Sequence, residues 1–405
     1  MNSPSSYRML LLALVLSSVP TSGMVAQVNV FLDFADFQLR LDDATTSAGV
    51  SSFSSAEVDE IRNNVIADIA LHYEGYSLTF SETDPGGDFE TMAFGWATTT
   101  NSYGSADSID FRNQIPNGMA RIFTANFDDF LEVGDTRSQQ ILEISTSLAG
   151  TASHELGHNL GLQHFDAYGI ASYTATNFNG SYKTNGAQNR HTMATSGTGM
   201  HEEEREVFRP LSDLSGVKLH MANGVSSSPI SLIAETGGSH GSAGSAQHIE
   251  LTSVAFGSDY DDASILQGFF NNSDYYSVDL DAGDKILIEI LGEILYENDF
   301  DSLIRLYDVD GTTVLFENDD MEINQTGVND GGPYTFDAML WNVPVANTGR
   351  YFVEVDSFGS GDSGNYELLL AVERLTAIPE PCAVFFLSAV LAGSAMHRRR
   401  RRFCC

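Results

Sequence analysis

The chain has 405 residues, with 55 acidic against 20 basic side chains and a formal net charge of -35. Its length and its 42% hydrophobic content are sufficient for more than one folded domain. The negative charge repels phosphate backbones and anionic lipid, which excludes nucleic-acid binding as a function. The three cysteines, Cys382, Cys404 and Cys405, all lie in the C-terminal tail, so the folded part is expected to contain no disulfide.

The first 26 residues have the pattern of a secretory signal peptide. Arg8 precedes an apolar run from Met9 to Leu16, and small residues continue to Ala26. This order of basic, apolar and small residues is typical of export signals. We therefore predict a signal peptide over 1–26 and a location outside the cytoplasm for the rest of the chain.

Strand and helix patterns alternate in the next hundred residues. Val28 to Phe34 is an apolar strand pattern, and Ser55 opens a helix whose apolar residues keep helical spacing to His72. Tyr76 to Phe80 is a second short strand. Thr91 to Thr98 is predicted as an edge strand that pairs with an extended peptide substrate.

A long helix is predicted before residue 160. Its apolar residues recur at intervals of three and four and form one stripe, comprising Ile141, Ile144, Leu148, Ala152 and Leu156. The histidines of the same segment fall on roughly the opposite side. One face of the helix therefore packs on a sheet while the other faces a cleft.

The cleft-facing residues belong to the sequence H-E-L-G-H-N-L-G-L-Q-H, which starts at His154. His154 and His158 are one helical turn apart on one face, and Gly161 permits the turn that returns His164 as a third nitrogen ligand. Three protein ligands leave a position on Zn²⁺ open for water. Glu155 is then the general base that takes a proton from that water.

This motif resembles that of the metzincin clan of zinc metallopeptidases, including matrixin-like catalytic domains. The resemblance implies a twisted mixed sheet with an active-site helix. It also implies a methionine turn beneath the metal, which we assign to Met193 with Met200 as the alternative. Phe165 follows the third histidine where better-known subfamilies carry Ser, Asp, Glu or Pro, so no subfamily is assigned.

A second module is predicted after a helix over 208–222 that closes the catalytic domain. Residues 223–247 are rich in Ser and Gly and are expected to be a linker, and 248–374 contain short alternating strands typical of a β-sandwich. Phrases such as Asp274 to Val278 and Thr348 to Val353 resemble the bacterial pre-peptidase C-terminal domain.

Several acidic residues are candidates for calcium ligands or for simple turn acids, and both interpretations stay open. In the catalytic domain they are Asp110 and Asp166. In the second module they are Asp299, Asp301, Asp308, Asp310, Asp319 and Asp320.

The tail over 377–405 has three successive features. Pro379-Glu380-Pro381 precedes an apolar run from Cys382 to Met396, which is followed by arginines from Arg398 to Arg402. This order resembles the PEP-CTERM sorting signal, which implies processing by an exosortase-type enzyme. The short apolar run is consistent with a transient membrane anchor, and a permanent anchor is the alternative.

The sequence thus predicts an α+β protein, with a metzincin-type zinc peptidase domain over 27–222 followed by an all-β sandwich. The predicted function is that of a secreted or cell-surface zinc metalloendopeptidase acting on protein or peptide, with Zn²⁺ as cofactor and Ca²⁺ as a candidate structural ion. Two alternatives remain: a surface adhesion or matrix protein with a vestigial metal site, and a zinc amidase acting on cell-wall peptide.

Overall fold

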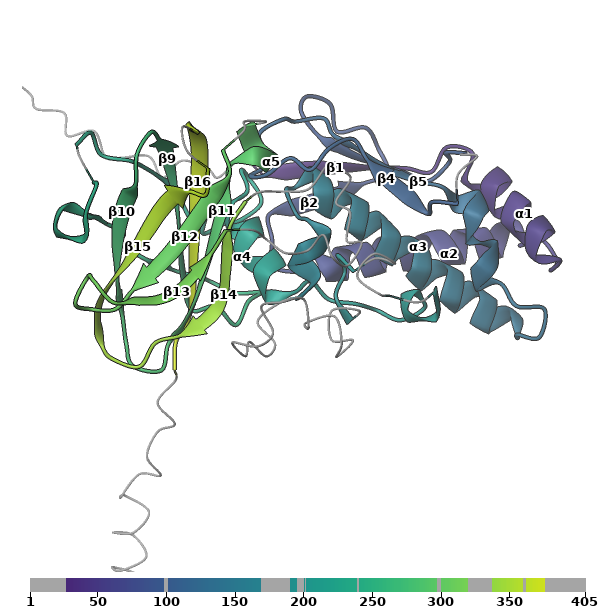
Figure 1. Cartoon of the computed structure of the whole chain (residues 1–405). Helices are drawn as coiled ribbons and strands as arrows, with labels where there is room; N and C mark the ends of the chain where they lie inside the picture. The colour runs from purple at the N-terminus through teal and green to yellow at the C-terminus, as the bar shows by residue number, and fades with distance from the viewer. Residues whose placement is uncertain are drawn as a thin grey trace, which may run out of the picture.

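The computed structural model describes residues 27–97, 101–168, 190–194, 200, 202–238, 240–296, 300–319, 337–359 and 362–375. Helices and one sheet from the N-terminal half lie beside two sheets from the C-terminal half (Figure 1). The described part of the chain is therefore a mixed α/β protein with three sheets. No helix within these ranges is both long and apolar enough to cross a membrane. The predicted signal peptide and C-terminal sorting segment lie outside the described residues.

The first sheet has the strand order β2-β1-β3-β5-β4. Its strands are β1 (Val28–Asp33), β2 (Leu78–Ser81), β3 (Glu90–Ala93), β4 (Gly104–Ala106) and β5 (Met119–Ile122). β1 runs parallel to both of its neighbours, β2 and β3, and β3 runs parallel to β5. β4 runs antiparallel to β5. The sheet is thus mixed, with its single antiparallel strand at one edge.

The prediction that Thr91 to Thr98 forms an edge strand is wrong. β3 pairs with β1 on one side and with β5 on the other, and Met92 is fully buried. The edge strands are instead β2 and β4, and the Gly-Ser-Ala sequence of β4 carries no apolar alternation and hence no strand signal.

The helices of this part share one apolar core with the first sheet. They are α1 (Phe37–Ala48), α2 (Ser55–His72), α3 (Arg137–Asn159) and the short 3-10 helix η1 (Thr124–Phe130). Both α2 and α3 begin with a reciprocal side-chain and backbone cap, Ser54 with Glu57 and Thr136 with Gln139. These caps fix where each helix starts.

The helix predicted over 208–222 begins later, as α4 (Asp213–Met221). Pro210 has no N–H to donate and disfavours helical geometry in the residue before it. The Ser212 hydroxyl then accepts the Ser215 N–H and caps the first turn.

Two sheets of the C-terminal half face each other across a shared apolar core and form a β-sandwich. Their orders are β13-β12-β15-β10-β7 and β14-β11-β16-β9-β6, with β8 added to β9. The strands are β6 (Leu232–Ala234), β7 (Gln247–His248), β8 (Thr252–Ser253), β9 (Asp262–Phe270), β10 (Asp274–Leu280), β11 (Lys285–Leu291), β12 (Ser302–Tyr307), β13 (Val314–Asn318), β14 (Met339–Pro344), β15 (Gly349–Ser357) and β16 (Gly364–Glu373).

Part of the segment 223–247, predicted as a linker, adds strands to the two sheets of the sandwich. β6 pairs in parallel with β9, β7 pairs in parallel with β10, and Ile230 is buried. The Ser/Gly composition predicted flexibility, but backbone pairing with existing strands needs little from side chains. The segment therefore contributes an edge strand to each of the two sheets.

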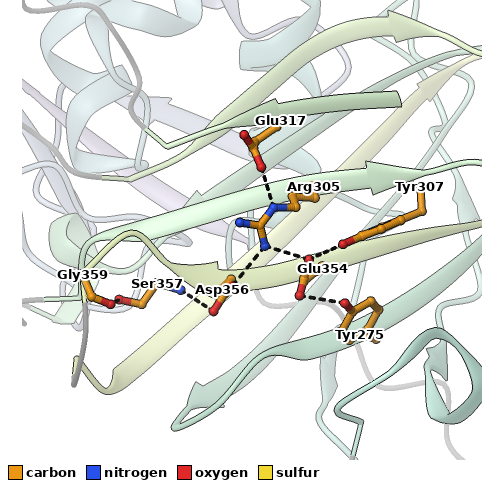
Figure 2. Close-up of polar contacts among 8 residues, drawn as sticks. All are labelled: Tyr275, Arg305, Tyr307, Glu317, Glu354, Asp356, Ser357 and Gly359. Carbon is orange, nitrogen blue, oxygen red and sulfur yellow. Dashed lines mark hydrogen bonds and ion pairs between the residues drawn. The ribbon is translucent and has the colours of Figure 1, made fainter. Parts of the chain in front are cut away.

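In the sheet β13-β12-β15-β10-β7, a row of polar residues on the outer face sets the strand register (Figure 2). Arg305 lies directly opposite Glu317 on one neighbouring strand and opposite Glu354 on the other. Arg305 Nη1 donates to Glu354 at 2.9 Å, and the Tyr275 hydroxyl donates to the same carboxylate at 2.7 Å. Opposed charged pairs of this kind stabilise a single register.

The outer face of β14-β11-β16-β9 is covered by the N-terminal half. Phe111, Leu214 and Val217 belong to one buried cluster with residues from these strands, including Ile265, Leu287, Leu369 and Ala371. An ion pair crosses the same boundary, because Arg112 makes two contacts of 2.9 and 2.6 Å with Glu367. The two halves are therefore joined by a buried interface.

Candidate metal centre

Three imidazoles converge at the C-terminal end of α3. The Nε2 atoms of His154 and His158 are 3.1 Å apart, and that of His164 lies 3.1 Å from the first and 3.2 Å from the second. Within the described residues, this is the one group of three His, Cys, Asp or Glu side chains placed to share an ion. The structure thus brings together the three histidines that the motif singled out.

The turn after α3 makes this convergence possible. Gly161 has φ +97°, a left-handed conformation that favours glycine. A Cβ atom on Gly161 would lie 2.6 Å from the Phe111 Cα atom, so no larger residue fits there. The Leu162 N–H donates to the Gly157 carbonyl at 2.8 Å, which closes the helix end. The chain is thereby reversed, and His164 returns toward the helix.

Backbone carbonyls fix the tautomers of two of these rings. His154 Nδ1 lies 3.0 Å from the Thr192 carbonyl oxygen, and His158 Nδ1 lies 2.7 Å from that of Leu162. Because a carbonyl only accepts, each Nδ1 carries the proton and each Nε2 presents a lone pair. Burial and the two neighbouring imidazoles hold the pKa of His154 well below 6.5, which keeps that ring neutral.

The nitrogen triangle fits zinc. Tetrahedral zinc with Zn–N distances of about 2.0–2.1 Å places ligand nitrogens roughly 3.3 Å apart. The observed separations are 3.1 to 3.2 Å. Lone pairs this close repel one another, and a cation between them removes the repulsion. Neutral imidazoles oriented by backbone carbonyls are also the usual donors for this metal.

Glu155 is buried beside the triangle, against the edge strand β4. The backbone N–H of Ala106 donates to its carboxylate. A Cβ atom on Gly104 would lie 2.6 Å from Glu155 Oε1, so glycine is what allows this close approach. Burial raises the pKa of Glu155 to about 7, although the charges of His164 and Arg205 act in the opposite direction. Sequence analysis did not find Gly104, because a lone glycine carries no chemical signal.

Met193 lies beside the same helix. It is fully buried in the turn that the Ala194 N–H closes on the His191 carbonyl, and a Cβ atom on Gly157 would lie 2.7 Å from its Sδ atom. Met200, the alternative, instead contacts Arg209 Nη1 through its sulfur at 2.8 Å. The geometry therefore places Met193, and not Met200, next to the histidine-bearing turn of α3.

Four of the acidic candidates for calcium ligands, Asp110, Asp166, Asp308 and Asp310, make turn or ion-pair contacts. Asp110 Oδ2 accepts the Ile115 N–H, and Asp310 Oδ1 accepts the N–H groups of Thr312 and Thr313. Asp166 Oδ2 accepts the Gln163 N–H. Asp299 and Asp320 lie outside the described residues. The turn interpretation accounts for these contacts.

Comparison with known proteins gives distant structural likenesses. The pre-peptidase C-terminal domain of a Bacillus anthracis collagenase is 17% identical over 31% of this chain and 93% of its own, with a TM-score of 0.21. High choriolytic enzyme 1, a hatching-enzyme zinc-protease from Oryzias latipes, is 14% identical over 36% of this chain and 47% of its own, with a TM-score of 0.16. OgpA from Akkermansia muciniphila, solved in a catalytically inactive form with an O-glycopeptide substrate, is 10% identical over 87% of this chain and 85% of its own, with a TM-score of 0.21.

No protein-family model matches the chain, and no curated protein matches it. The TM-scores of the solved structures are too low for those likenesses to support a function.

Proposed function

We propose that the protein is a zinc-dependent endopeptidase with a metzincin-type catalytic domain over 27–222 and a β-sandwich over 248–374. The observation that carries the proposal is the triangle of Nε2 atoms from His154, His158 and His164, with the Glu155 carboxylate buried beside it. Neutral nitrogen donors and an adjacent carboxylate are what zinc-assisted hydrolysis of an amide requires.

When bound by these histidines, zinc supplies a Lewis acid that makes water acidic and polarises a carbonyl group. Glu155 accepts a proton from the attacking water and returns it to the leaving amine. Burial raises the pKa of Glu155, which makes its carboxylate a stronger base. The Ala106 N–H holds the carboxylate in place for both transfers, and the absence of a side chain on Gly104 leaves room for it there.

A peptide is the substrate that the edge of the sheet favours. β4 pairs with β5 on one side and is the last described strand in the order, so its other edge would face an extended chain, and there the Ala106 N–H donates to Glu155 and the Gly104 carbonyl accepts the Ser102 hydroxyl. The same strand contacts Glu155 through Gly104 and Ala106. A peptide added to β4 would therefore pass beside the general base, and main-chain pairing would require little of its side chains.

Export and surface sorting complete the proposal. The signal pattern over 1–26 would direct the chain out of the cytoplasm, and the tail over 377–405 would hold it transiently in the membrane until an exosortase-type enzyme cuts near Pro379 to Pro381. Substrate proteins would then be met outside the cell or at its surface. The strongly negative net charge of -35 suits a partner other than nucleic acid.

The test compares zinc content and cleavage of an unfolded protein between the wild type and Glu155→Gln. Glu143→Gln, on the same helix but outside the site, is the matched control. We expect about one zinc per chain in all three proteins, with a cleavage rate at least 100-fold lower in Glu155→Gln alone. A wild type without zinc, or cleavage indifferent to Glu155, would overturn the mechanism and favour the adhesion alternative. Cleavage of cell-wall peptide but not of protein would favour the amidase.

A further inference from the structure

We propose that the β-sandwich is a structural component of the metal centre, because it holds both ends of the short segment that carries His164. Lys218 and Arg112 are the two positioning residues through which it acts. The inference rests on the proposed function, since it concerns zinc bound by the same three histidines.

One end of the segment is held by a buried ion triad. Lys218 on α4 contacts Asp166 Oδ1 at 2.8 Å and Glu289 Oε1 at 2.9 Å. All three side chains are at most 1% exposed. Asp166 lies two residues after His164, whereas Glu289 belongs to β11 of the sandwich. Lys218 therefore connects the histidine segment to the sandwich directly.

Asp166 passes this connection on to the backbone around His164. Its Oδ2 atom accepts the Gln163 N–H at 2.8 Å, and its own N–H donates to the Gln163 carbonyl at 3.0 Å. The Ser212 hydroxyl donates to the Asp166 carbonyl. The Asp166 side chain thus adds to the contacts that fix the turn from Gln163 to Asp166, and His164 lies inside that turn.

The other end of the segment is held at Gly161. Its left-handed turn packs on the backbone of Phe111 and Arg112, with 2.6 Å from a Cβ position to the Phe111 Cα atom and 2.9 Å to the Arg112 nitrogen. The Arg112 side chain forms its bidentate pair with Glu367 of β16, which is fully buried. A second connection therefore reaches the sandwich from the opposite end.

The sandwich side of both connections is unusual for a strand. Glu289 and Glu367 lie on the outer face of their sheet, the same face as Leu287 and Leu369, and each is fully buried there. Burying a carboxylate costs several kcal/mol unless a cation accompanies it. The two acids and their two cations thus specify how the sandwich sits on the catalytic part.

The histidines on α3 differ from His164 in this respect. His154 and His158 are placed by the long helix α3, whereas His164 is the first residue of a short 3-10 helix, His164–Tyr168, that follows the turn at Gly161. Changes to residues that orient metal ligands commonly cost 10- to 100-fold in metal affinity. We therefore expect loss of Lys218 to weaken zinc binding by roughly 10-fold through His164.

The experiment measures zinc affinity of the full chain by competition with a chelator, which is independent of activity. Lys218→Met and Arg112→Met are compared with Val217→Ala, which removes packing in the same interface and on the same helix as Lys218 but no ion pair. We expect the zinc dissociation constant to rise roughly 10-fold in the first two variants and to stay within twofold in Val217→Ala, although all three lower the melting temperature. Glu289→Gln, which keeps an oxygen acceptor for Lys218, should stay near the wild type.

Equal zinc affinity in Lys218→Met and Val217→Ala would overturn the inference while leaving the zinc site intact. A wild type that does not bind zinc would instead overturn the proposed function itself. If Lys218→Met does not fold, Glu289→Leu removes the sandwich side of the triad while Lys218 keeps Asp166. It should still raise the dissociation constant severalfold over Val217→Ala, and an unchanged value would again overturn the inference.

Discussion

The contact between Gly104 and Glu155 makes a sharp prediction for Gly104→Ala. The added methyl carbon would lie 2.6 Å from Oε1, 2.7 Å from Cγ and 2.9 Å from Cδ of Glu155. Ordinary contacts begin at about 3.4 Å, so the carboxylate has to move by roughly 1 Å. A displacement of that size in a catalytic group costs about 100-fold in rate. We therefore expect kcat to fall by about 100-fold.

The assay follows cleavage of an unfolded protein together with zinc content and melting temperature. Gly134→Ala is the control, because Gly134 is exposed and no atom lies within 4 Å of its Cβ position. Zinc content should be unchanged in both variants, since Gly104 contacts the base and none of the three histidines among its closest neighbours. A normal kcat in Gly104→Ala, or the same loss in Gly134→Ala, would refute the assignment of Glu155 as a base positioned by β4.

Three further predictions concern stability. Gly157→Ala places a methyl group 2.7 Å from the Met193 Sδ atom and should lower the free energy of unfolding by about 1–3 kcal/mol, measured in urea; an unchanged value would contradict the packing of Met193 on α3. Burial lowers the pKa of His72 from 6.5 to about 4, so unfolding takes up a proton in this range and stability should fall, by up to about 3 kcal/mol, as the pH drops from 6.5 to 4. His72→Gln should flatten that slope, and an equal slope in the variant would exclude His72 as its source. Burial, and the charge of Asp110, raise the pKa of Glu90 from 4.5 to about 7, so stability should decrease as the pH rises through this range, and Glu90→Gln should unfold at a higher temperature than the wild type at pH 8.

Much of the metal centre could be predicted because its logic is local. The spacing of His154 and His158 follows from helical periodicity, whereas the predicted division of α3 into a packed face and a cleft face is not seen, because every residue from Ile144 to Asn159 is buried. Gly161 signals a left-handed turn, which its φ of +97° shows. Local rules of this kind need no knowledge of the rest of the fold, so they are available from sequence alone.

The edge strand could not be predicted, because the order of strands is not a local property. Thr91 to Thr98 has the apolar character of a strand, but that character reflects burial between two neighbours and not a position at the edge. β4 consists of three small residues, of which Gly104 and Ala106 contact Glu155, and small residues give no hydrophobic pattern. Hydrophobic patterning thus pointed to the buried internal strand β3 and not to the edge strand β4.

The ion pairs between the two halves leave a signal in the sequences of β11 and β16. β11 has the sequence K-I-L-I-E-I-L and β16 has G-N-Y-E-L-L-L-A-V-E, so both are apolar on nearly consecutive residues. A strand with one face in water alternates, whereas a strand covered on both faces does not. The acids Glu289 and Glu367 within such strands therefore indicate a buried partner, but their cations, Lys218 and Arg112, come from distant segments that no spacing rule connects.

The two outer faces of the sandwich differ in what occupies them. The face of β11 and β16 is taken up by α4 and the loop at Phe111, so it is not available to a ligand. On the opposite sheet, Glu354 already accepts three hydrogen bonds, from Arg305, Tyr275 and Tyr307 (Figure 2). A carboxylate satisfied in this way is a poor cation ligand, because an ion would have to displace those donors. The interactions of these two faces are thus internal or directed at the N-terminal half, which favours a role in shaping the proposed metal centre over one as an independent binding module.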